Sequence, residues 1–435
     1  MQPSPLASYN RIWSVLQPVA KLHLLLRSWR GREDKSRLSE RYGKSKTPRP
    51  KGPLFWLHAV SVGESVAALT LAASLREIRP DLNILITTNT ITAAKRIAAQ
   101  DDPGLYHAYQ PLDHPQWVAA FLHHWRPDYA VMLESDFWPN LISCTAAQDI
   151  PLFFASSQLS DKAFQSWQKR PEMARAIFSA ARDIFAVDSR QAEKFSQLAG
   201  SSPNKPRIHI GGSLKLNPAS LKIDDKLVDM LKKAANKRPI LVAASTHKGE
   251  EALIVAASRT ARDKGFPHFL IIAPRHPERG SDIAASLNGA SQRSKAMTPQ
   301  PADDIYICDS LGEMGSLYTA ADLIILGGTF ANLGGHNPLE IALFETPVLA
   351  GPSRFKNTRA FEQLTQAGLI EQADDGDKLA TALAKKLSER SKNELLISDK
   401  NKQQIAAIAA EACSRAPNTA NYLLETLSEN TSSNI

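Results

Sequence analysis

Short apolar runs alternate with amphipathic segments from about residue 54 onward. In the segment after Gly63, for example, Leu71, Leu75 and Ile78 recur at the spacing of one helix face. Buried runs that alternate with amphipathic helices indicate a mostly parallel sheet covered by helices. The runs of the first half that predict strands are Leu54–Val60, Ile84–Thr88, Tyr129–Leu133, Pro151–Ser156, Ile184–Val187 and Arg207–Ile210.

The same pattern restarts after a polar, lysine-rich stretch near residues 218–238. The sequence therefore predicts an α/β fold of two Rossmann-like domains that face each other across a cleft, with a linker near 215–238. A length of 435 residues agrees with two domains, because a single core stops growing at about 250–300 residues. The second set of predicted strands is Ile240–Ala244, Phe269–Ala273, Ile305–Cys308, Leu323–Leu326 and Val348–Ala350.

The N-terminal segment is both basic and apolar, which suits a membrane surface. The net charge of the chain is +8, and basic residues concentrate between positions 21 and 51. Residues 12–26 are apolar but are interrupted by Gln17, Pro18, Lys21 and His23. Since a spanning helix needs ~20 mostly apolar residues, we expect this segment to lie in the interface, with its basic flank on anionic headgroups. A divergent anchor and a packing helix of the first domain are the alternatives.

Other classes of partner and cofactor find no support in the residues. Basic side chains are not interleaved with aromatic ones as in RNA-binding motifs, so we expect no nucleic-acid partner. Cys144, Cys308 and Cys413 lie far apart and show neither metal-ligand spacing nor a disulfide framework. No other metal-ligand pattern occurs, so we expect no required metal and no cofactor. The sequence leaves the oligomeric state open.

Acidic residues follow two predicted strands of the first half. Glu64 comes in the turn after the first strand, at a helix N-terminus that favours its ionised form and makes it a candidate base for a hydroxyl proton. A first-turn glutamate is also a common capping residue. Glu134 and Asp136 follow the third strand, where they suit transition-state stabilisation or the orientation of acceptor hydroxyls. A capped helix start at Pro139 is the alternative there, and it leaves Glu134 without a role.

Polar groups also follow the strands of the second half. Arg275 comes directly after Phe269–Ala273, where a guanidinium suits forked contacts to a nucleotide phosphate. Two glycine turns, at 327–328 and 334–335, precede a helix start that can face phosphate, while Asn337 and Glu340 can bind ribose hydroxyls. Together these positions predict an enzyme that uses a nucleotide sugar.

Five runs of residues, taken in order, resemble the 3-deoxy-D-manno-octulosonic acid (Kdo) transferases of lipopolysaccharide core biosynthesis. The resemblance implies a GT-B glycosyltransferase that moves Kdo from CMP-Kdo to a lipid A precursor, a tetra-acyl disaccharide bisphosphate. It also implies a location at the cytoplasmic face of the inner membrane. The matching runs, which lie between about residues 30 and 370, are His58–Glu64, Glu134–Asn140, Ala244–Glu251, Pro274–Arg279 and Gly334–Glu340.

The resemblance implies a role for each matching residue. Glu64 would be the general base for the acceptor hydroxyl, whose oxygen attacks the anomeric carbon of Kdo as CMP leaves with inversion. Glu134 and Lys215 would stabilise the transition state. The positions that match CMP-binding residues are Pro274, Arg275, Gly312, Glu313, Met314, Asn337, Pro338, Leu339 and Glu340.

The resemblance also suggests how the chain is divided. We expect a membrane-associating segment at 1–30 and an acceptor-binding Rossmann-like domain at 31–217. A domain that binds CMP-Kdo, with C-terminal helices, would follow at 218–427, and a polar, frayed tail at 428–435.

Three segments of the first half depart from the pattern of the family: Asn89–Thr92, Ser156–Gln158 and Ser213. The second half matches more fully, so the resemblance specifies the donor more closely than the acceptor or the number of Kdo residues added. Two other functions remain open. One is a GT-B transferase or epimerase that uses a UDP-sugar, and the other is a non-catalytic relative that binds lipid A. Survival of the three catalytic candidates together argues against the second.

Overall fold

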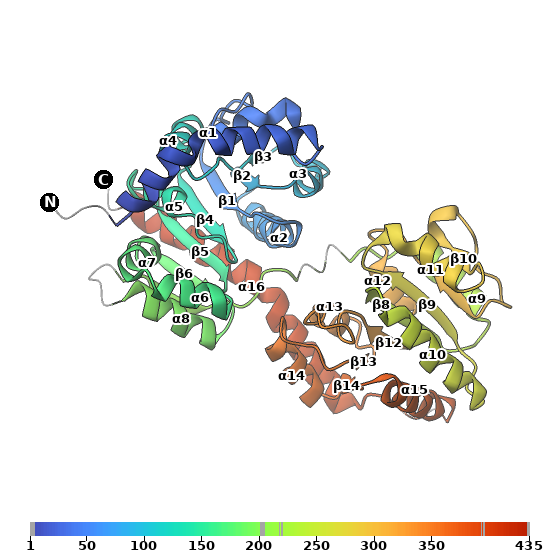
Figure 1. Ribbon diagram of the computed structural model, residues 1–435. Helices are drawn as coiled ribbons and strands as arrows, with labels where there is room; N and C mark the ends of the chain where they lie inside the picture. Colours follow the sequence, from blue (N-terminus) through green and yellow to red (C-terminus); the bar gives the residue numbers. More distant parts are fainter. Residues whose placement is uncertain are drawn as a thin grey trace. The chain divides into compact units, whose positions relative to one another are not determined.

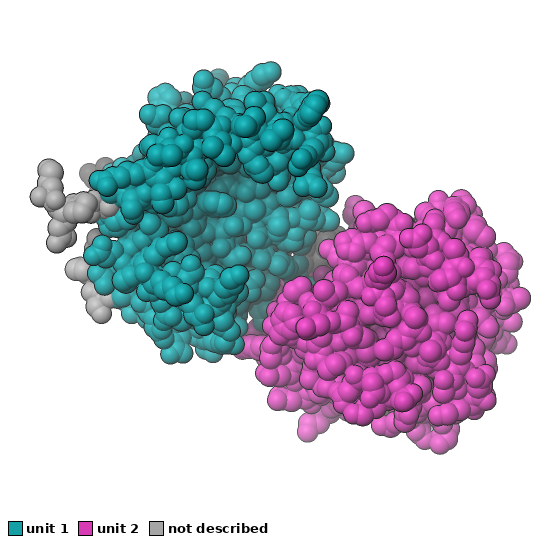
Figure 2. Space-filling view, viewed as in Figure 1, with its two compact units in different colours: residues 1–216, 414–435 teal, residues 217–413 magenta. Residues whose placement is uncertain are grey.

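The structure is a computed structural model that describes residues 5–200, 205–216, 218, 221–392, 394 and 396–432. The chain forms two compact units, which Figure 1 shows as ribbons and Figure 2 in two colours. Unit 1 consists of residues 1–216 and 414–435, and unit 2 of residues 217–413. Each unit contains its own parallel sheet.

The sheet of unit 1 has seven strands in the order β3-β2-β1-β4-β5-β6-β7, and every neighbouring pair is parallel. β1 pairs with β2 on one side and with β4 on the other. The strand order therefore reverses between β1 and β4, and ligands of open α/β sheets bind at such a switch point. The strands are β1 (Leu54–His58), β2 (Asn83–Thr88), β3 (Leu105–Tyr109), β4 (Tyr129–Leu133), β5 (Leu152–Ser157), β6 (Asp183–Ala186) and β7 (Arg207–Ile210).

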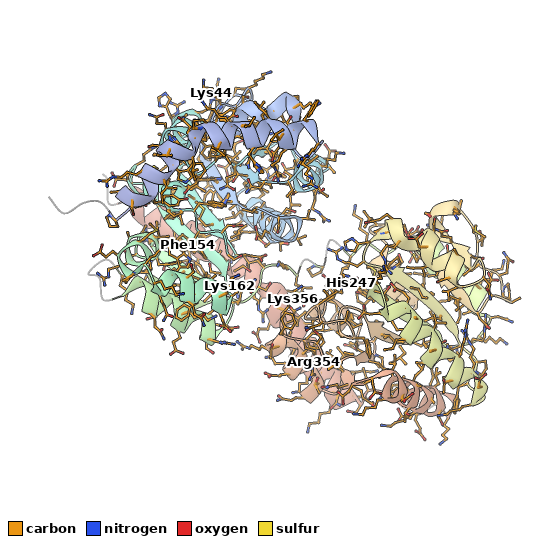
Figure 3. All side chains as sticks on the ribbon, in the orientation of Figure 1. Lys44, Phe154, Lys162, His247, Arg354 and Lys356 are labelled. Atoms are coloured by element: carbon orange, nitrogen blue, oxygen red, sulfur yellow. The ribbon has the colours of Figure 1, made fainter. Side chains whose placement is uncertain are left out.

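Apolar side chains from both faces of this sheet build the core of unit 1. Trp56 belongs to the core cluster on one face, whereas Phe55 and Leu57 belong to the cluster on the other, as the period of a strand requires. Phe154, labelled in Figure 3, is fully buried on β5. The helices are α1 (Ala7–Trp29), the 3-10 helix η1 (Lys35–Tyr42), α2 (Val62–Ile78), α3 (Ile91–Ala98), α4 (Pro115–Trp125), α5 (Pro139–Ala146), α6 (Asp161–Gln168), α7 (Pro171–Phe178), α8 (Ser189–Ala199) and part of α16 (Asp399–Ser432).

The sheet of unit 2 repeats this architecture in the order β10-β11-β9-β8-β12-β13-β14, again with parallel pairs throughout. β8 lies between β9 and β12, so its switch point falls between β8 and β12. The strands are β8 (Ile240–Thr246), β9 (Phe269–Pro274), β10 (Ser291–Gln292), β11 (Ile305–Ile307), β12 (Leu323–Leu326), β13 (Val348–Ala350) and β14 (Ile370–Gln372).

The helices of unit 2 include one that the sequence analysis assigned to a linker. α9 (Asp225–Ala235) lies within the expected linker at 215–238 and buries Leu227 and Leu231 against unit 2. Its apolar residues recur at helical spacing, so the polar composition of the stretch concealed an amphipathic helix. The other helices are α10 (Glu250–Asp263), the 3-10 helices η3 (Pro277–Arg279) and η4 (Arg293–Lys295), α11 (Gly280–Ser286), α12 (Met314–Ala320), α13 (Leu339–Ala342), α14 (Thr358–Gln366) and α15 (Gly376–Ser391).

The last helix, α16, begins in unit 2 and ends in unit 1. From residue 414 onward it belongs to unit 1, where Ala420 and Leu423 join the core cluster that contains Phe55 and Leu57. The sequence analysis gave residues up to 427 to the second domain, so the end of that range lies in the other unit. The expected tail at 428–435 is helical as far as Ser432, and its last three residues lie outside the described residues.

Helix α1 contains the whole apolar stretch at residues 12–26. Trp13 packs edge-on against His114 and Trp117, and the hydroxyl of Tyr9 donates a hydrogen bond to Asp113 Oδ2 at 2.8 Å. The helix therefore packs on unit 1 through one face. Among the described residues, no helix combines the length and the apolar character that crossing a membrane demands.

Candidate active site

Glu64 lies in the first turn of α2, directly after β1. Its Oε2 accepts hydrogen bonds from the backbone N–H groups of Val60 and Ser61, at 2.5 and 3.1 Å, while its own N–H donates to Ser61 Oγ at 3.3 Å. This reciprocal capping box is the capping role that the sequence left open. Because the carboxylate is buried and held in one orientation, the same contacts also make it a fixed chemical group.

Asp136 lies near Glu64, in the segment that follows the neighbouring strand β4. The negative charge of Glu64, at the start of α2, acts on the carboxyl group of Asp136 in the segment after β4. β1 and β4 are adjacent in the sheet, so their carboxyl ends meet at its switch point.

Glu134 and Lys215 form an ion pair beside this carboxyl pair. Glu134 Oε2 accepts from Lys215 Nζ at 2.8 Å and from Gln158 Nε2 at 3.3 Å. A Cβ atom built on Gly63 would lie 3.9 Å from Lys215 Nζ, so the ammonium also lies close to the first turn of α2. Glu134 Oε1 is buried and has no hydrogen-bond partner among the described residues. An unpaired buried carboxylate oxygen is costly, which marks this atom as one that a ligand could use.

The backbone at these strand ends is strained. Glu134, Ser156 and Ser245 adopt φ angles of 61, 53 and 55°, in the left-handed region that non-glycine residues rarely occupy. Glu134 directly follows β4, and Ser156 and Ser245 are the next-to-last residues of β5 and β8. Such strain is found mostly at functional sites, where the surrounding structure enforces it.

Burial and like charges shift the acidic groups of this cluster. Burial, and next the charge of the nearby Glu64 carboxylate, raise the pKa of Asp136 to about 7. Burial also raises the pKa of Glu134, although the charge and hydrogen bond of Lys215 oppose that rise. Shifts with these causes at a strand-end cluster are typical of catalytic acids and bases. The structure thus brings Glu64, Glu134 and Lys215 close together, with Asp136 and Gln158 beside them, and the catalytic roles of these residues stay predictions.

The three segments that depart from the family pattern have local structural roles. Asn89 accepts a hydrogen bond from the buried Arg41 at 2.6 Å, and Thr90 caps the N-terminus of α3. Ser156 Oγ accepts from the backbone of Leu214 at 3.3 Å, which fixes the segment that carries Lys215. Of these segments, Ser156–Gln158 therefore supports the carboxylate cluster, because Gln158 also donates to Glu134.

In unit 2, Glu250 ties the ends of two adjacent strands together. Its carboxylate accepts from the backbone N–H groups of Gly328, Phe330 and Ala331 after β12, and from that of His247 after β8, at 2.8–3.1 Å. Gly327 permits this close approach, because a Cβ atom there would lie 2.4 Å from the carbonyl oxygen of Ser245. At the first glycine turn predicted from the sequence, the backbone that follows β12 therefore passes close to the backbone at the end of β8.

A pair of histidines lies at the same switch point. The Nε2 atoms of His247 and His336 are 2.9 Å apart and the two rings are parallel within 5°. Burial is the main cause that lowers the pKa of both, to about 4 for His336, and the positive charge of Arg275 contributes to each shift. His247 belongs to the matching run Ala244–Glu251, but the sequence analysis gave it no role. The adjacency of β8 and β12, which brings the two rings together, is not visible in the sequence.

The predicted CMP-binding residues Pro274 and Arg275 end and follow β9, the other neighbour of β8. Pro274 is buried, whereas Arg275 is exposed. The charges of Arg275 and of Lys356 both act on His336, which places them near the histidine pair. Figure 3 labels His247 at the end of β8 and Lys356 on the segment before α14. The strand ends of unit 2 therefore present cationic groups that suit an anionic ligand.

Gly312, Glu313 and Met314 follow β11 and begin α12. Gly312 is exposed with a φ of 84°, as expected for a turn that offers its backbone. The carboxylate of Glu313 is occupied by an ion pair with Arg293, with nitrogen–oxygen distances of 2.7 and 3.0 Å. Burial raises the pKa of Glu313, but the hydrogen bonds from Arg293, Ser310 and Cys308 together with the charge of Arg293 outweigh it, so the pKa is lowered.

Residues 337–340 form the turn into the short helix α13. Asn337 Oδ1 accepts from the backbone of Leu339 at 3.2 Å. The side chains of Pro338 and Leu339 are buried, so these two residues support the turn instead of presenting side chains to a ligand. Burial raises the pKa of Glu340, and the charge of Arg275 opposes that rise. In the described ranges, no group of three or more His, Cys, Asp or Glu side chains is arranged to hold a metal ion.

Two parallel seven-stranded sheets, each with polar groups at its switch point, define a GT-B glycosyltransferase fold. Solved structures with a similar fold include the UDP-GlcNAc 2-epimerase of Neisseria meningitidis bound to UDP-GlcNAc, with a TM-score of 0.58 and 13% identity over 86% of this chain and 100% of that one. A glycosyltransferase of Rickettsia africae also has a TM-score of 0.58 and 13% identity, over 88% of this chain and 100% of that one. At this identity the likeness shows the fold alone.

The family is shown by sequence. Residues 36–217 match the family described as 3-deoxy-D-manno-octulosonic-acid transferase (kdotransferase). The 3-deoxy-D-manno-octulosonic acid transferase of Rickettsia bellii is 30% identical over 88% of this chain and 90% of its own length. The 3-deoxy-D-manno-octulosonic acid transferase of Haemophilus influenzae is 30% identical over 89% of this chain and 92% of its own length. The chain belongs to the Kdo transferase family, and it is therefore a glycosyltransferase that transfers Kdo.

Proposed function

We propose that this protein transfers Kdo from CMP-Kdo to a sugar hydroxyl of a lipid A precursor, with inversion at the anomeric carbon. The observation that carries the proposal is the cluster of Glu64, Asp136, Glu134 and Lys215 at the switch point of unit 1. It combines a fixed carboxylate that can accept a proton with an adjacent ion pair that can stabilise charge.

In this proposal Glu64 takes the proton of the acceptor hydroxyl. The hydroxyl oxygen then forms a bond to the anomeric carbon of Kdo, while the bond from that carbon to the phosphate oxygen breaks and its electron pair leaves with CMP. Attack from the face opposite the leaving group inverts the configuration. Lys215 and Glu134 stabilise the charges that develop in the transition state, and the buried, unpartnered Oε1 of Glu134 is available to the sugar.

The donor would bind at the strand ends of unit 2. Arg275 is exposed there, near Lys356 and the histidine pair, and these groups suit the single phosphate of CMP-Kdo. Gly312 and Met314 offer backbone groups to the base or ribose, and Asn337 and Glu340 adjoin the second glycine turn. The resemblance assigns CMP contacts to all these positions except Lys356 and the histidines. No metal ion or other cofactor is part of the proposal.

We further propose that α1 holds the protein on the cytoplasmic face of the inner membrane. Its outward face carries apolar side chains at helical spacing, and two of them, Val15 and Trp29, are 76% and 83% exposed. Exposed apolar residues on one helix face, flanked by basic residues, are typical of helices that lie in a bilayer interface. The full set is Ile12, Val15, Leu16, Val19, Leu22, Leu25, Leu26 and Trp29.

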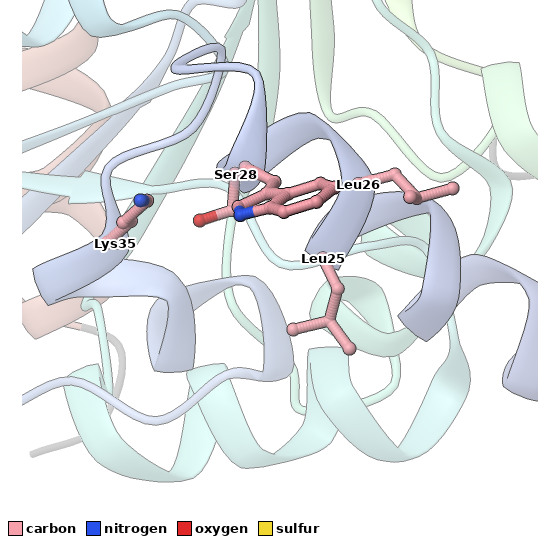
Figure 4. A pocket seen from close by; sticks show the side chains of 5 residues that line it. Leu25, Leu26, Ser28 and Lys35 are labelled. Atoms are coloured by element: carbon pink, nitrogen blue, oxygen red, sulfur yellow. The ribbon is translucent and has the colours of Figure 1, made fainter.

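The C-terminal end of α1 adds a pocket to this face. Leu25, Leu26, Ser28 and Trp29 line it together with Lys35, and its volume is about 370 Å³ (Figure 4). Aliphatic walls beside an ammonium group suit a lipid whose acyl chain adjoins a phosphate. This lining supports contact with an anionic lipid at this end of the helix.

The function is tested by incubating the purified protein with CMP-Kdo and a tetra-acylated lipid A precursor and counting added Kdo residues by mass spectrometry. We expect a mass increase with the wild type and none with Glu64→Gln. Glutamine keeps an oxygen that can accept the capping hydrogen bonds, so α2 stays capped while the base is lost. Asp101→Asn, an exposed carboxylate of the same unit, is the matched control and should transfer normally. No product with the wild type, together with a larger thermal shift from UDP than from CMP, would instead support a UDP-sugar enzyme.

A further inference from the structure

His247 directly follows β8, His336 directly follows the second glycine turn, and their Nε2 atoms face each other at 2.9 Å. The two rings are parallel within 5° and their centroids are 5.1 Å apart, which suits an end-to-end N–H···N hydrogen bond. At that distance only one of the two Nε2 atoms carries a hydrogen. In the neutral pair, the histidine that donates has a bare Nδ1, and its partner carries its hydrogen on Nδ1. The two rings are therefore opposite tautomers.

One added proton changes what this pair offers to a ligand. In the neutral pair, the two outer nitrogens are one donor and one acceptor. An added proton occupies the bare Nδ1, so the pair keeps its internal hydrogen bond, presents two donors and carries a positive charge. The pair can therefore match an anion whose negative charge increases during a reaction.

Two fixed cations come from the turns beside the pair. The backbone N–H of Arg275 donates to the carbonyl oxygen of Thr246, the residue before His247, at 2.9 Å. The backbone N–H of Lys356 donates to the carbonyl oxygen of Gly334 at 3.1 Å, and a Cβ atom on Gly334 would lie 2.7 Å from Lys356 Cγ. Both cationic residues are exposed, so their charges are available to a ligand at the pair.

The pair is neutral near pH 7 in the absence of a ligand. Burial is the main cause that lowers the pKa of both histidines, to about 4 for His336. The Glu250 carboxylate lies beside His247, but its oxygens already accept from four backbone N–H groups. An opposite charge within ~4–6 Å shifts a pKa by about 1–3 units, so a doubly charged phosphate can raise the pKa of the pair toward neutrality. The charged and titratable groups around the pair are Glu250, Arg275, His276, Arg279 and Lys356.

We propose that His247 and His336 bind the phosphate of the donor and take up one proton from water as CMP departs. This inference rests on the proposed function, in which CMP-Kdo binds at these strand ends. The phosphate of CMP-Kdo is a diester with one negative charge. When its bond to the anomeric carbon breaks, the electron pair stays on the phosphate oxygen, and CMP gains a second negative charge. The pair matches this charge with the added proton and returns the proton to water when CMP dissociates.

The test observes the histidine nitrogens by NMR, without turnover, in the full chain labelled with 15N in its histidine side chains. His247→Gln and His336→Gln assign the two signals, which should show opposite neutral tautomers at pH 7. Saturating CMP should raise the apparent pKa of the pair by about two units or more, whereas cytidine, which lacks the phosphate, should leave it unchanged. The signal of His123, which is exposed in unit 1, should respond to neither compound. An unchanged titration of the pair with CMP bound would overturn the inference.

The same variants separate charge from structure, because glutamine can hydrogen-bond but cannot be protonated at these positions. We expect each to lower kcat about 10- to 100-fold and to weaken CMP binding, with little change in the KM for CMP-Kdo, since the added proton matches only the second charge. His123→Gln should behave as the wild type does. An equal loss of affinity for CMP and CMP-Kdo, with a lower melting temperature of unit 2, would show a structural role and overturn the inference.

The two measurements also distinguish this inference from the proposed function. If the wild type makes no product while CMP shifts the titration of the pair, the proposed function fails and the phosphate site stands. If the wild type transfers Kdo but CMP leaves the titration unchanged, the phosphate site fails and the function stands.

Discussion

Tyr422, on the last helix, donates a hydrogen bond to Asp183 Oδ1 on β6 at 2.8 Å, across 239 residues of sequence. Arg207 and His209 on β7 donate to the same carboxylate, whose side chain has 0% exposure. Burial alone would raise the pKa of Asp183, but these hydrogen bonds outweigh it and lower the pKa below its usual value. Helix α16 is thus hydrogen-bonded to the sheet of unit 1 through the buried carboxylate of Asp183.

We expect Tyr422→Phe to destabilise unit 1 by about 1–3 kcal/mol at pH 7, because it removes one hydrogen bond from a buried carboxylate. Because the pKa of Asp183 is lowered in the folded state, its contribution is present above the unfolded pKa of about 4 and is lost as pH falls through the lower folded value. The difference between variant and wild type should therefore shrink in acid.

Tryptophan fluorescence during urea unfolding measures this effect in unit 1 alone, because all seven tryptophans lie between positions 13 and 167. The control is Tyr306→Phe in unit 2, which loses a bond to the Met297 carbonyl and should leave the tryptophan transition unchanged. An equal shift in both variants would contradict the specific role of Tyr422.

Polar substitutions on the outward face of α1 should weaken membrane binding. We expect the double variant Val15→Ser, Leu22→Ser to bind vesicles containing anionic phosphatidylglycerol at least about tenfold less in co-sedimentation, since each apolar side chain contributes roughly 1.5–3 kcal/mol when fully buried. Ile78→Ser replaces an exposed apolar residue at the far end of α2 and should bind as the wild type does. Unchanged binding by the double variant would rule out α1 as the contact.

Loss of the Lys215 ammonium should disable turnover and alter the pH dependence of stability. Burial raises the pKa of Glu134 and Lys215 lowers it, so in Lys215→Met the folded-state pKa rises further. A raised carboxyl pKa favours the folded state at low pH, and this advantage is lost as pH rises through the folded value. The melting temperature of unit 1 should therefore decline more steeply from pH 5 to 8 than in the wild type.

The same variant should lower kcat about 100-fold or more with little change in the KM for CMP-Kdo. Lys162→Met, at an exposed position of unit 1 that Figure 3 labels, should change neither property. A normal kcat in Lys215→Met would show that the ion pair serves structure only.

Substitutions at two predicted donor contacts should affect CMP affinity and the stability of unit 2 differently. The Arg275 side chain is exposed and makes no hydrogen bond or ion pair within the described part of the chain, so Arg275→Ala should lower CMP affinity about 10- to 100-fold by calorimetric titration while unit 2 melts normally. Glu313→Gln breaks the ion pair with Arg293 and should lower both affinity and melting temperature. Arg259→Ala, on the exposed face of α10, controls for net charge. Normal affinity in Arg275→Ala would remove that residue from the donor site.

Long apolar runs made much of the fold predictable. The predicted bounds of β4, β7, β12 and β13 agree with the structure, because each run ends at a polar or turn residue. Leu105–Tyr109 was not predicted, since its polar and aromatic residues lie at the edge region of the sheet, where less burial is required. β10 was not predicted because it has only two residues, and β14 was not predicted because two of its three residues, Glu371 and Gln372, are polar.

The site was predictable at the level of strand ends but not of contacts. Sequence placed Glu64 and Glu134 each after a strand, and the structure brings them together because β1 and β4 are neighbours. The link from Asp136 to Glu64 and the pairing of His247 with His336 both depend on strand order. Strand order follows from long-range packing, which local periodicity does not encode. The roles of these residues in Kdo transfer stay predictions.

The return of α16 to unit 1 has a consequence for synthesis of the chain. Unit 2 is one continuous stretch, residues 217–413, whereas unit 1 needs both the beginning and the end of the polypeptide. A chain that grows from its N-terminus can finish unit 2 while the core of unit 1 still lacks Ala420 and Leu423. The carboxylate cluster therefore lies in the unit that the ribosome completes last, and a chain that ends before residue 414 would contain all of unit 2 but an incomplete unit 1.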